Sequence, residues 1–115
     1  MNYKTARAFL IAQGNALETQ QNPNDCLMML KQGKPPVPGQ MTSILVALKI
    51  AFEVLQAEPN LDRELTVAIH VLCYESYRLY ATGREAGVEW PPLLNEDLER
   101  MERAVRSIFA GSWQG

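Results

Sequence analysis

The stretch of residues 42–57 is the most apolar part of the chain. Its polar residues Thr42, Lys49, Glu53 and Gln56 fall close to one narrow line when they are placed on a helix of about 3.6 residues per turn. A helix with so little polar surface must be covered on most sides, either by other elements of its own chain or by a second copy. The pattern therefore predicts a central helix around which the other elements pack.

Other segments also repeat apolar residues with helical spacing. Three of them cover about residues 3–20, 61–82 and 95–110, and a shorter one covers 25–32. Gly14 lies inside the first and costs it about 1 kcal/mol relative to alanine, which packing can offset. The core positions expected on the three longer segments are Ala6, Phe9, Leu10, Gln13, Ala16 and Leu17, then Leu61, Leu65, Ala68, Ile69, Leu72 and Leu79, and finally Leu94, Leu98, Met101, Val105, Ile108 and Phe109.

Residues suited to capping predict where these helices begin and end. Asn22 and Asn60 are suited to begin the helices that follow them, because an asparagine oxygen can accept a hydrogen bond from a free amide of the first turn. Gly33, Gly83 and Gly111 are suited to end helices, because glycine readily adopts the left-handed conformation common there.

Prolines restrict the connections between the helices. Residues 34–39 contain three prolines and are biased to a stiff, extended conformation, so the central helix is expected to begin between residues 38 and 43. Pro59 ends it, since the residue before a proline disfavours helical geometry. Segment 34–39 has the length of a spacer within a domain. We therefore predict an all-α fold over residues 1–115, a compact single-domain bundle of four longer helices and one short helix.

Charge and hydropathy narrow the classes of partner. The 115 residues carry a formal net charge of −2, which provides no basic field to collect phosphates, so no nucleic-acid partner is expected. The apolar run of the central helix covers about a dozen positions, whereas a membrane-spanning helix needs about 20. No membrane partner is expected, and the predicted location is cytoplasmic.

The sequence offers little for catalysis or metal binding. His70 is the only histidine, and with Cys73 it makes two ligands, too few for a zinc site. The same pair lacks the orienting group and the oxyanion donors that a cysteine nucleophile needs. Cys26 and Cys73 form no Cys-x-x-Cys motif and are expected to be reduced and half-buried. We expect no catalytic residue, no metal and no cofactor.

The last helical segment carries alternating charges. Acidic and basic residues four positions apart are expected to pair along it: Glu96 with Arg100, Glu99 with Arg103, and Glu102 with Arg106. The pattern predicts a nearly neutral, solvated face and no basic binding surface.

The most informative cluster is aromatic. His70, Tyr74 and Tyr77 follow one another at i, i+4 and i+7, and Tyr80 is adjacent. One interpretation is that these rings border the core and stack on the proline loops. The other is that they form a partner-binding surface, because tyrosine is a favoured interface anchor.

Two tryptophans lie outside the predicted helices. Trp90 precedes Pro91 in a second stiff loop, and Trp113 lies in the tail after Gly111. Both are expected to anchor their segments on the core, with partner binding as the alternative role. The candidate partner-binding residues are therefore His70, Tyr74, Tyr77, Tyr80 and Trp90.

Two segments resemble a set of small cyanobacterial proteins of uncharacterised function. They read Pro-Val-Pro-Gly-Gln-Met-Thr-Ser-Ile-Leu at residues 36–45 and Gly-Val-Glu-Trp-Pro-Pro-Leu-Leu at residues 87–94, and the resemblance extends over most of the chain. It implies a cyanobacterial cytoplasmic protein without an assured activity. Some of these proteins carry a dethiobiotin synthetase label. That enzyme is a P-loop α/β protein, whereas this sequence lacks the loop and the strands, so the resemblance supplies no catalytic residue.

The leading functional hypothesis is a non-enzymatic helical protein that acts through a protein partner or through self-association, with a homodimer as one form. It rests on the apolar central helix, the aromatic cluster and the absence of a catalytic constellation. The alternative is a small-ligand-binding or enzymatic helical protein with a pocket between helices near His70 and Cys73. A helix-turn-helix DNA-binding protein is disfavoured by the net charge.

Overall fold

The computed structural model describes all 115 residues and contains six helices and no strand. The four longer helices are α1 (Tyr3–Gly14), α4 (Gln40–Leu55), α5 (Arg63–Glu85) and α6 (Leu94–Ala110), and the short ones are α2 (Ala16–Thr19) and α3 (Cys26–Lys31). The predicted all-α bundle with four longer helices is confirmed. No helix combines the length and the low polarity needed to span a bilayer.

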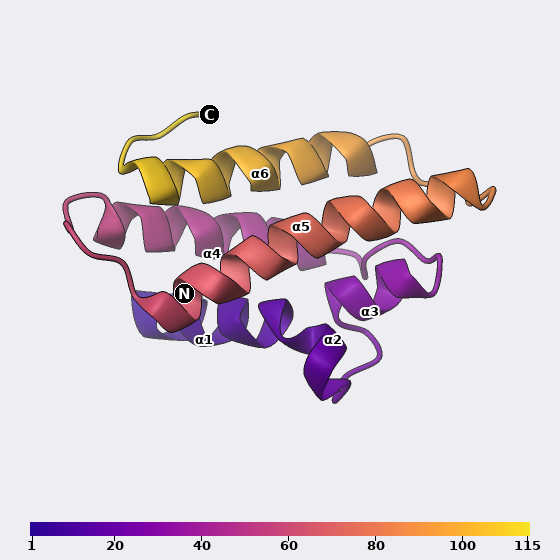
Figure 1. Ribbon diagram of the computed structural model, residues 1–115, viewed down its shortest axis with the longest axis horizontal. Coiled ribbons are helices and arrows are strands. Elements are labelled where there is room, and N and C mark those ends of the chain that lie inside the picture. The colour runs from indigo at the N-terminus through magenta and orange to yellow at the C-terminus, as the bar shows by residue number, and fades with distance from the viewer.

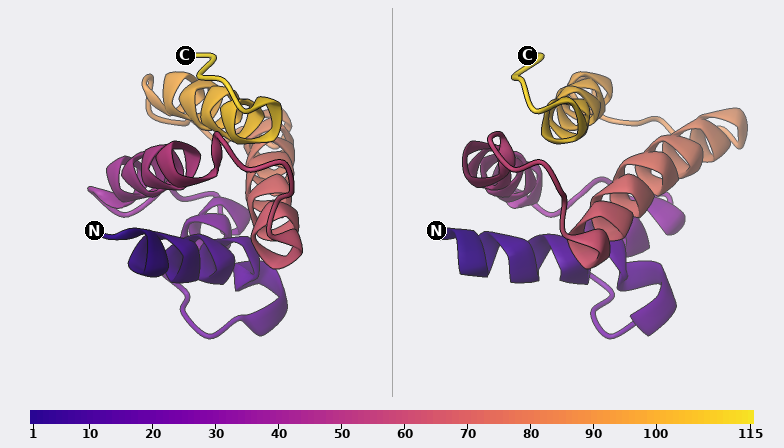
Figure 2. Two further views of the ribbon diagram at one scale, coloured as in Figure 1. Left: turned by 90° about the vertical axis from the view of Figure 1, so that its left-hand side faces the viewer. Right: turned by 60° about the vertical axis from the view of Figure 1, so that its left-hand side comes forward.

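The longer helices form layers, with α4 between α1 and α6 (Figure 1). Figure 2 shows α4 and α5 on opposite sides of the space between α6 and α1. One cluster of 23 buried residues, drawn from all six helices, fills that space. The radius of gyration is 13.6 Å, close to the roughly 13 Å expected for a single compact domain of this length.

The central helix α4 begins and ends within the predicted limits. Gly39 lies at its N-terminus with a φ of +84°, and the helix ends at Leu55, before the proline at position 59. The predicted polar line is exposed, apart from the half-buried Lys49. Two apolar residues also remain open to solvent, since Val46 and Val54 are 45% and 46% exposed. Neighbouring helices therefore cover α4 incompletely.

The first predicted helix is divided at Asn15, so the continuous helix over residues 3–20 is wrong. Gly14 is the last residue before the break and is closely packed. A Cβ at Gly14 would lie 2.2 Å from the carbonyl oxygen of Ala68, so α1 and α5 touch here backbone to backbone. Next to this contact, the buried side chain of Gln13 accepts a hydrogen bond from the backbone N–H of Cys26 at 3.3 Å, which fixes the start of α3 against α1. The chain turns at Asn15, between the end of α1 and the start of α2, directly after this contact.

Two predicted helix starts are also wrong. Asp25 rather than Asn22 precedes α3, and Asp62 rather than Asn60 precedes α5. The Asp62 carboxylate accepts a hydrogen bond from the backbone N–H of Leu65 at 3.3 Å. Each true cap is an aspartate within three residues of the predicted asparagine. Both aspartates also make tertiary contacts with α1, since Asp25 accepts a hydrogen bond from the Gln13 side chain and Asp62 pairs with Arg7.

The predicted helix ends are confirmed at Gly33 and Gly111, which have φ values of +74° and +73°. The predicted end at Gly83 is wrong, because α5 continues to residue 85. A Cβ at Gly83 would lie 2.5 Å from the indole of Trp90. The glycine is therefore needed for close packing, while Gly87 supplies the left-handed residue after the helix.

Candidate functional site

The five predicted partner-binding residues do not form one surface. His70 and Tyr74 are exposed on α5, with stacked rings whose centroids are 6.2 Å apart. Tyr77, Tyr80 and Trp90 are half-buried and pack against the hydrophobic core. The aromatic cluster is therefore divided between the two interpretations, with three rings bordering the core and two facing solvent.

Tyr80 and Trp90 hold the loop after α5 against that helix. Their rings stack with centroids 5.9 Å apart, and the indole N–H of Trp90 donates a hydrogen bond to the backbone carbonyl of Tyr80 at 2.9 Å. Gly83 leaves the space that the indole fills. The polar atom of the indole is satisfied and its ring is packed, as in a structural anchor.

The exposed aromatic residues belong to a face shared by α5 and α6. A shallow hollow of about 320 Å³ lies between the two helices here. Its largest exposed rings are Tyr74 on α5 and Phe109 on α6, which are 59% and 44% exposed. Phe109 was predicted in the core, and this prediction is wrong. We call this surface the α5–α6 face and define it by five residues that line the hollow, His70, Cys73, Tyr74, Val105 and Phe109. We add the exposed Val67, which lies on the same side of α5 as His70 and Tyr74 by helical spacing.

The cysteine of this face is not set up as a nucleophile. Burial raises the pKa of the Cys73 thiol to about 11, and the nearby Glu102 carboxylate adds to the effect. Burial raises the pKa of Cys26 to about 12. Both thiols are free and stay protonated near neutral pH, and a protonated thiol is a poor nucleophile. Cys26 is fully buried, so the prediction that both thiols are half-buried holds only for Cys73.

The other titratable groups of the molecule are relevant to metal binding and, through shifted pKa values, to acid–base chemistry. No three His, Cys, Asp or Glu side chains gather in a way that could hold a metal ion. Burial raises the pKa of the Tyr77 phenol, with the charges of Cys73, Glu99 and Glu102 as further causes. Ion pairing of Arg7 with Asp62 lowers the pKa of that carboxyl, which lies at the start of α5 and has a structural role.

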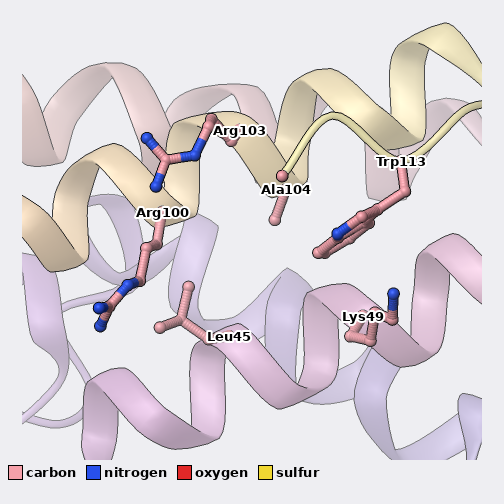
Figure 3. Close-up of a pocket in the computed structure, with 7 residues that line it drawn as sticks. Leu45, Lys49, Arg100, Arg103, Ala104 and Trp113 are labelled. Carbon is pink, nitrogen blue, oxygen red and sulfur yellow. The ribbon is translucent and has the colours of Figure 1, made fainter.

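A second hollow lies on the other side of α6. It has a volume of about 230 Å³ and is enclosed by α4, α6 and the tail that follows α6. Figure 3 shows Leu45 on α4 between Arg100 and Ala104 of α6 on one side and Lys49 on the other, with Lys49 next to the indole of Trp113, which closes one end. We call this hollow the α4–α6 pocket; its remaining charged residue is Arg103.

The sequence predicted a nearly neutral face for α6, but the side of α6 that lines the pocket is basic. Of the three predicted pairs, the structure contains only that of Glu102 with Arg106. Arg100 instead contacts Asp97 at 3.3 Å, and Arg103 makes no ion pair. Two arginines of the supposedly neutral stripe therefore line a pocket with Lys49.

Sequence reasoning missed the α4–α6 pocket because its residues come from three separate segments. Lys49 offered one signal, since it is the single basic residue inside the most apolar helix. Trp113 was expected to anchor the tail, and its ring does pack on that of Phe52, with centroids 5.1 Å apart. Nothing in the spacing of these residues indicated that they meet.

Comparison of the chain with protein-family models, with curated proteins and with solved structures finds no match.

Proposed function

We propose that the protein is a non-enzymatic helical protein that acts by association, and that the α5–α6 face joins two copies of the chain. The observation that carries the proposal is the exposure of large apolar side chains on this face. Val67, Tyr74 and Phe109 are 54%, 59% and 44% exposed. Aromatic side chains that combine apolar area with few rotatable bonds are typical anchors of protein interfaces.

The charges of the face favour a second copy as the partner. Glu102 and Arg106 border the hollow and pair with each other, so the charged part of the face is close to neutral. Two copies related by a twofold axis place the same patch against itself. A neutral patch meets no like-charge repulsion in that arrangement.

The length of α5 gives the face an extended edge along which a second copy could pack. Its 23 residues span roughly 35 Å at about 1.5 Å per residue. A standard interface buries roughly 800 Å² on each partner. On α5, Val67, His70 and Tyr74 follow at i, i+3 and i+7, which places them along one side of the helix.

Light scattering behind size exclusion, over a dilution series, tests the proposal. We expect wild type to have twice the 12.9 kDa mass of one chain at protein concentrations above the dimer dissociation constant, and to dissociate on dilution. Val67→Asp should give a monomer. Val46→Asp is the matched control, because Val46 is a valine on α4 with a similar exposure of 45%. Thermal unfolding of both variants checks that they remain folded.

Two results would refute self-association through this face. One is a wild type that stays monomeric at the highest concentration reached. The other is a dimer that survives Val67→Asp and Tyr74→Asp but dissociates with Val46→Asp, which would assign the interface to α4.

A second candidate function is small-ligand binding in the hollow of the α5–α6 face. The hollow of about 320 Å³ has His70 and Cys73 on its wall, which supports this candidate. A protonated thiol makes binding more plausible there than covalent chemistry. Native mass spectrometry of the purified protein should then show the added mass of a bound ligand, and the double variant His70→Ala/Cys73→Ala should lose that added mass. An unchanged added mass in the double variant would count against ligand binding in this hollow.

A further inference from the structure

We propose that the α4–α6 pocket binds a small organic anion, one that carries a carboxylate or phosphate on a flat or apolar body. The pocket lies on the opposite side of α6 from the α5–α6 face, so this proposal does not depend on self-association. The argument rests on its charge, its size and the position of Trp113.

All the charged residues that line the pocket are basic. They are Lys49 from α4 and Arg100 and Arg103 from α6. Gly115 in the tail also lines the hollow and lies beside the side chain of Arg103. Lys49 and Arg103 have no ion-pair partner, while Arg100 contacts Asp97 at 3.3 Å on an exposed part of α6. The pocket therefore has an excess of positive charge in a protein whose net charge is −2. Guanidinium groups bind carboxylate and phosphate oxygens with charge-assisted hydrogen bonds.

The rest of the lining is apolar and suits the body of the ligand. Leu45 and Ala104 lie opposite each other on α4 and α6, and Trp113 closes one end (Figure 3). At about 230 Å³ the pocket is smaller than the roughly 300–1,000 Å³ typical of sites for drug-sized ligands. A single ring or a short aliphatic chain with one anionic group is therefore the appropriate size.

The tail keeps the indole in place at the pocket. The backbone N–H of Gln114 donates a hydrogen bond to the hydroxyl of Ser107 at 2.7 Å, and that hydroxyl donates to the carbonyl of Arg103. The ammonium nitrogen of Lys49 lies 3.7 Å from the centroid of the Trp113 ring. This contact holds one of the three cations at the pocket without neutralising its charge.

The experiment is a titration of the full chain followed by the two indole N–H signals in a nitrogen–proton correlation spectrum. Benzoate and phenyl phosphate are the probes, and comparing them shows whether the site prefers carboxylate or phosphate. Trp113 lines the pocket and Trp90 packs beside Gly83. We expect both probes to shift the Trp113 signal saturably and to leave that of Trp90 in place. Benzylamine, which has a similar ring and a positive charge, should leave both signals in place.

Substitutions assign the binding to the basic residues. Lys49→Gln and Arg103→Gln should each weaken binding about tenfold, the loss expected when one charge-assisted contact is removed. Arg106→Gln is the matched control, because it makes the same charge change on α6 at a residue that lines the hollow of the other face. The dispersion of the spectra shows that each variant is folded, and Arg103→Gln stands alone if Lys49→Gln unfolds.

Several results would overturn the proposal. The first is no saturable shift of the Trp113 signal with either probe. The second is a shift with benzylamine as large as that with benzoate. The third is a loss of binding in Arg106→Gln as large as that in Arg103→Gln. The last result would mean that general charge, and not this pocket, attracts the anion.

Discussion

Replacing Gly14 with alanine should destabilise the protein, although alanine is the better helix former. In an isolated helix this change would favour folding by about 1 kcal/mol. Here the added Cβ would lie 2.2 Å from the carbonyl oxygen of Ala68 and 2.7 Å from its carbonyl carbon and Cα. All three atoms belong to the backbone of α5, so no side-chain rotation can relieve the overlap.

The size of the effect follows from this geometry. An ordinary contact of about 3.4 Å requires α1 and α5 to separate by roughly 1 Å, and a gap of that size removes up to about half of the dispersion energy along the contact. Overpacking of a core costs about 1–3 kcal/mol and occasionally more. Because the overlap is with backbone and is severe, we take the upper end of this range, about 3 kcal/mol. Subtracting the helix preference of alanine, about 1 kcal/mol, leaves a net loss of about 2 kcal/mol, which lowers the melting temperature by roughly 8 °C in a domain of this size.

Denaturant unfolding followed by circular dichroism measures this loss. Gly39→Ala is the control, because Gly39 has a φ of +84° but no atom within 4 Å of its expected Cβ. It should lose only the backbone strain of about 1 kcal/mol. Ala68→Gly should not rescue Gly14→Ala, because the overlapping atoms of residue 68 are in the backbone.

The reasoning would be refuted by a Gly14→Ala variant as stable as wild type. Full rescue by Ala68→Gly would show that the side chain of Ala68 causes the overlap, contrary to the structure.

Three further predictions concern buried or paired groups. The hydroxyl of Ser76 is buried without a hydrogen-bond partner. Ser76→Ala should therefore leave the free energy of unfolding unchanged or raise it by about 0.5–1 kcal/mol, as measured by denaturant unfolding. A clear loss of stability would mean that the hydroxyl does have a hydrogen-bond partner. The hydrogen bond from Arg7 lowers the pKa of Asp62, so its stabilisation is complete above the ordinary pKa of about 4 and is lost as the pH falls below it. Asp62→Asn should therefore flatten the acid side of a stability–pH curve; an unchanged curve would assign the acid sensitivity to other groups. With a pKa of about 11, Cys73 should react with iodoacetamide near pH 8 roughly 100-fold more slowly than free cysteine, and the more deeply buried Cys26 should react more slowly still. Mass spectrometry measures both rates. Rapid modification would show that the thiols are accessible.

The sequence determined the helices and most of the core by itself. The apolar positions of α5 recur at helical spacing, and Leu65, Ile69 and Leu72 are buried as expected. Gly33 and Gly111 end helices as predicted, because their left-handed conformation is a local property of the chain. These features depend on residues close together in sequence, so their periodicity and capping preferences are sufficient to predict them.

Tertiary structure decided the role of each glycine inside a helix. From the sequence, Gly14 was expected only to weaken its helix and Gly83 to end one. In the structure each lies where another part of the chain comes too close for a Cβ, the backbone of Ala68 in one case and the indole of Trp90 in the other. The distance between two segments is set by the packing of the whole core, and the sequence around a glycine does not contain it.

The candidate sites depended on tertiary structure in the same way. Tyr74 and Tyr77 are neighbours on α5, yet Tyr74 faces solvent and Tyr77 packs on the core. Arg103 was expected to pair with Glu99 along α6, but it lines a pocket that the tail helps to close. Helical spacing determines which residues share a side of a helix. What covers that side is determined only when the helices pack together.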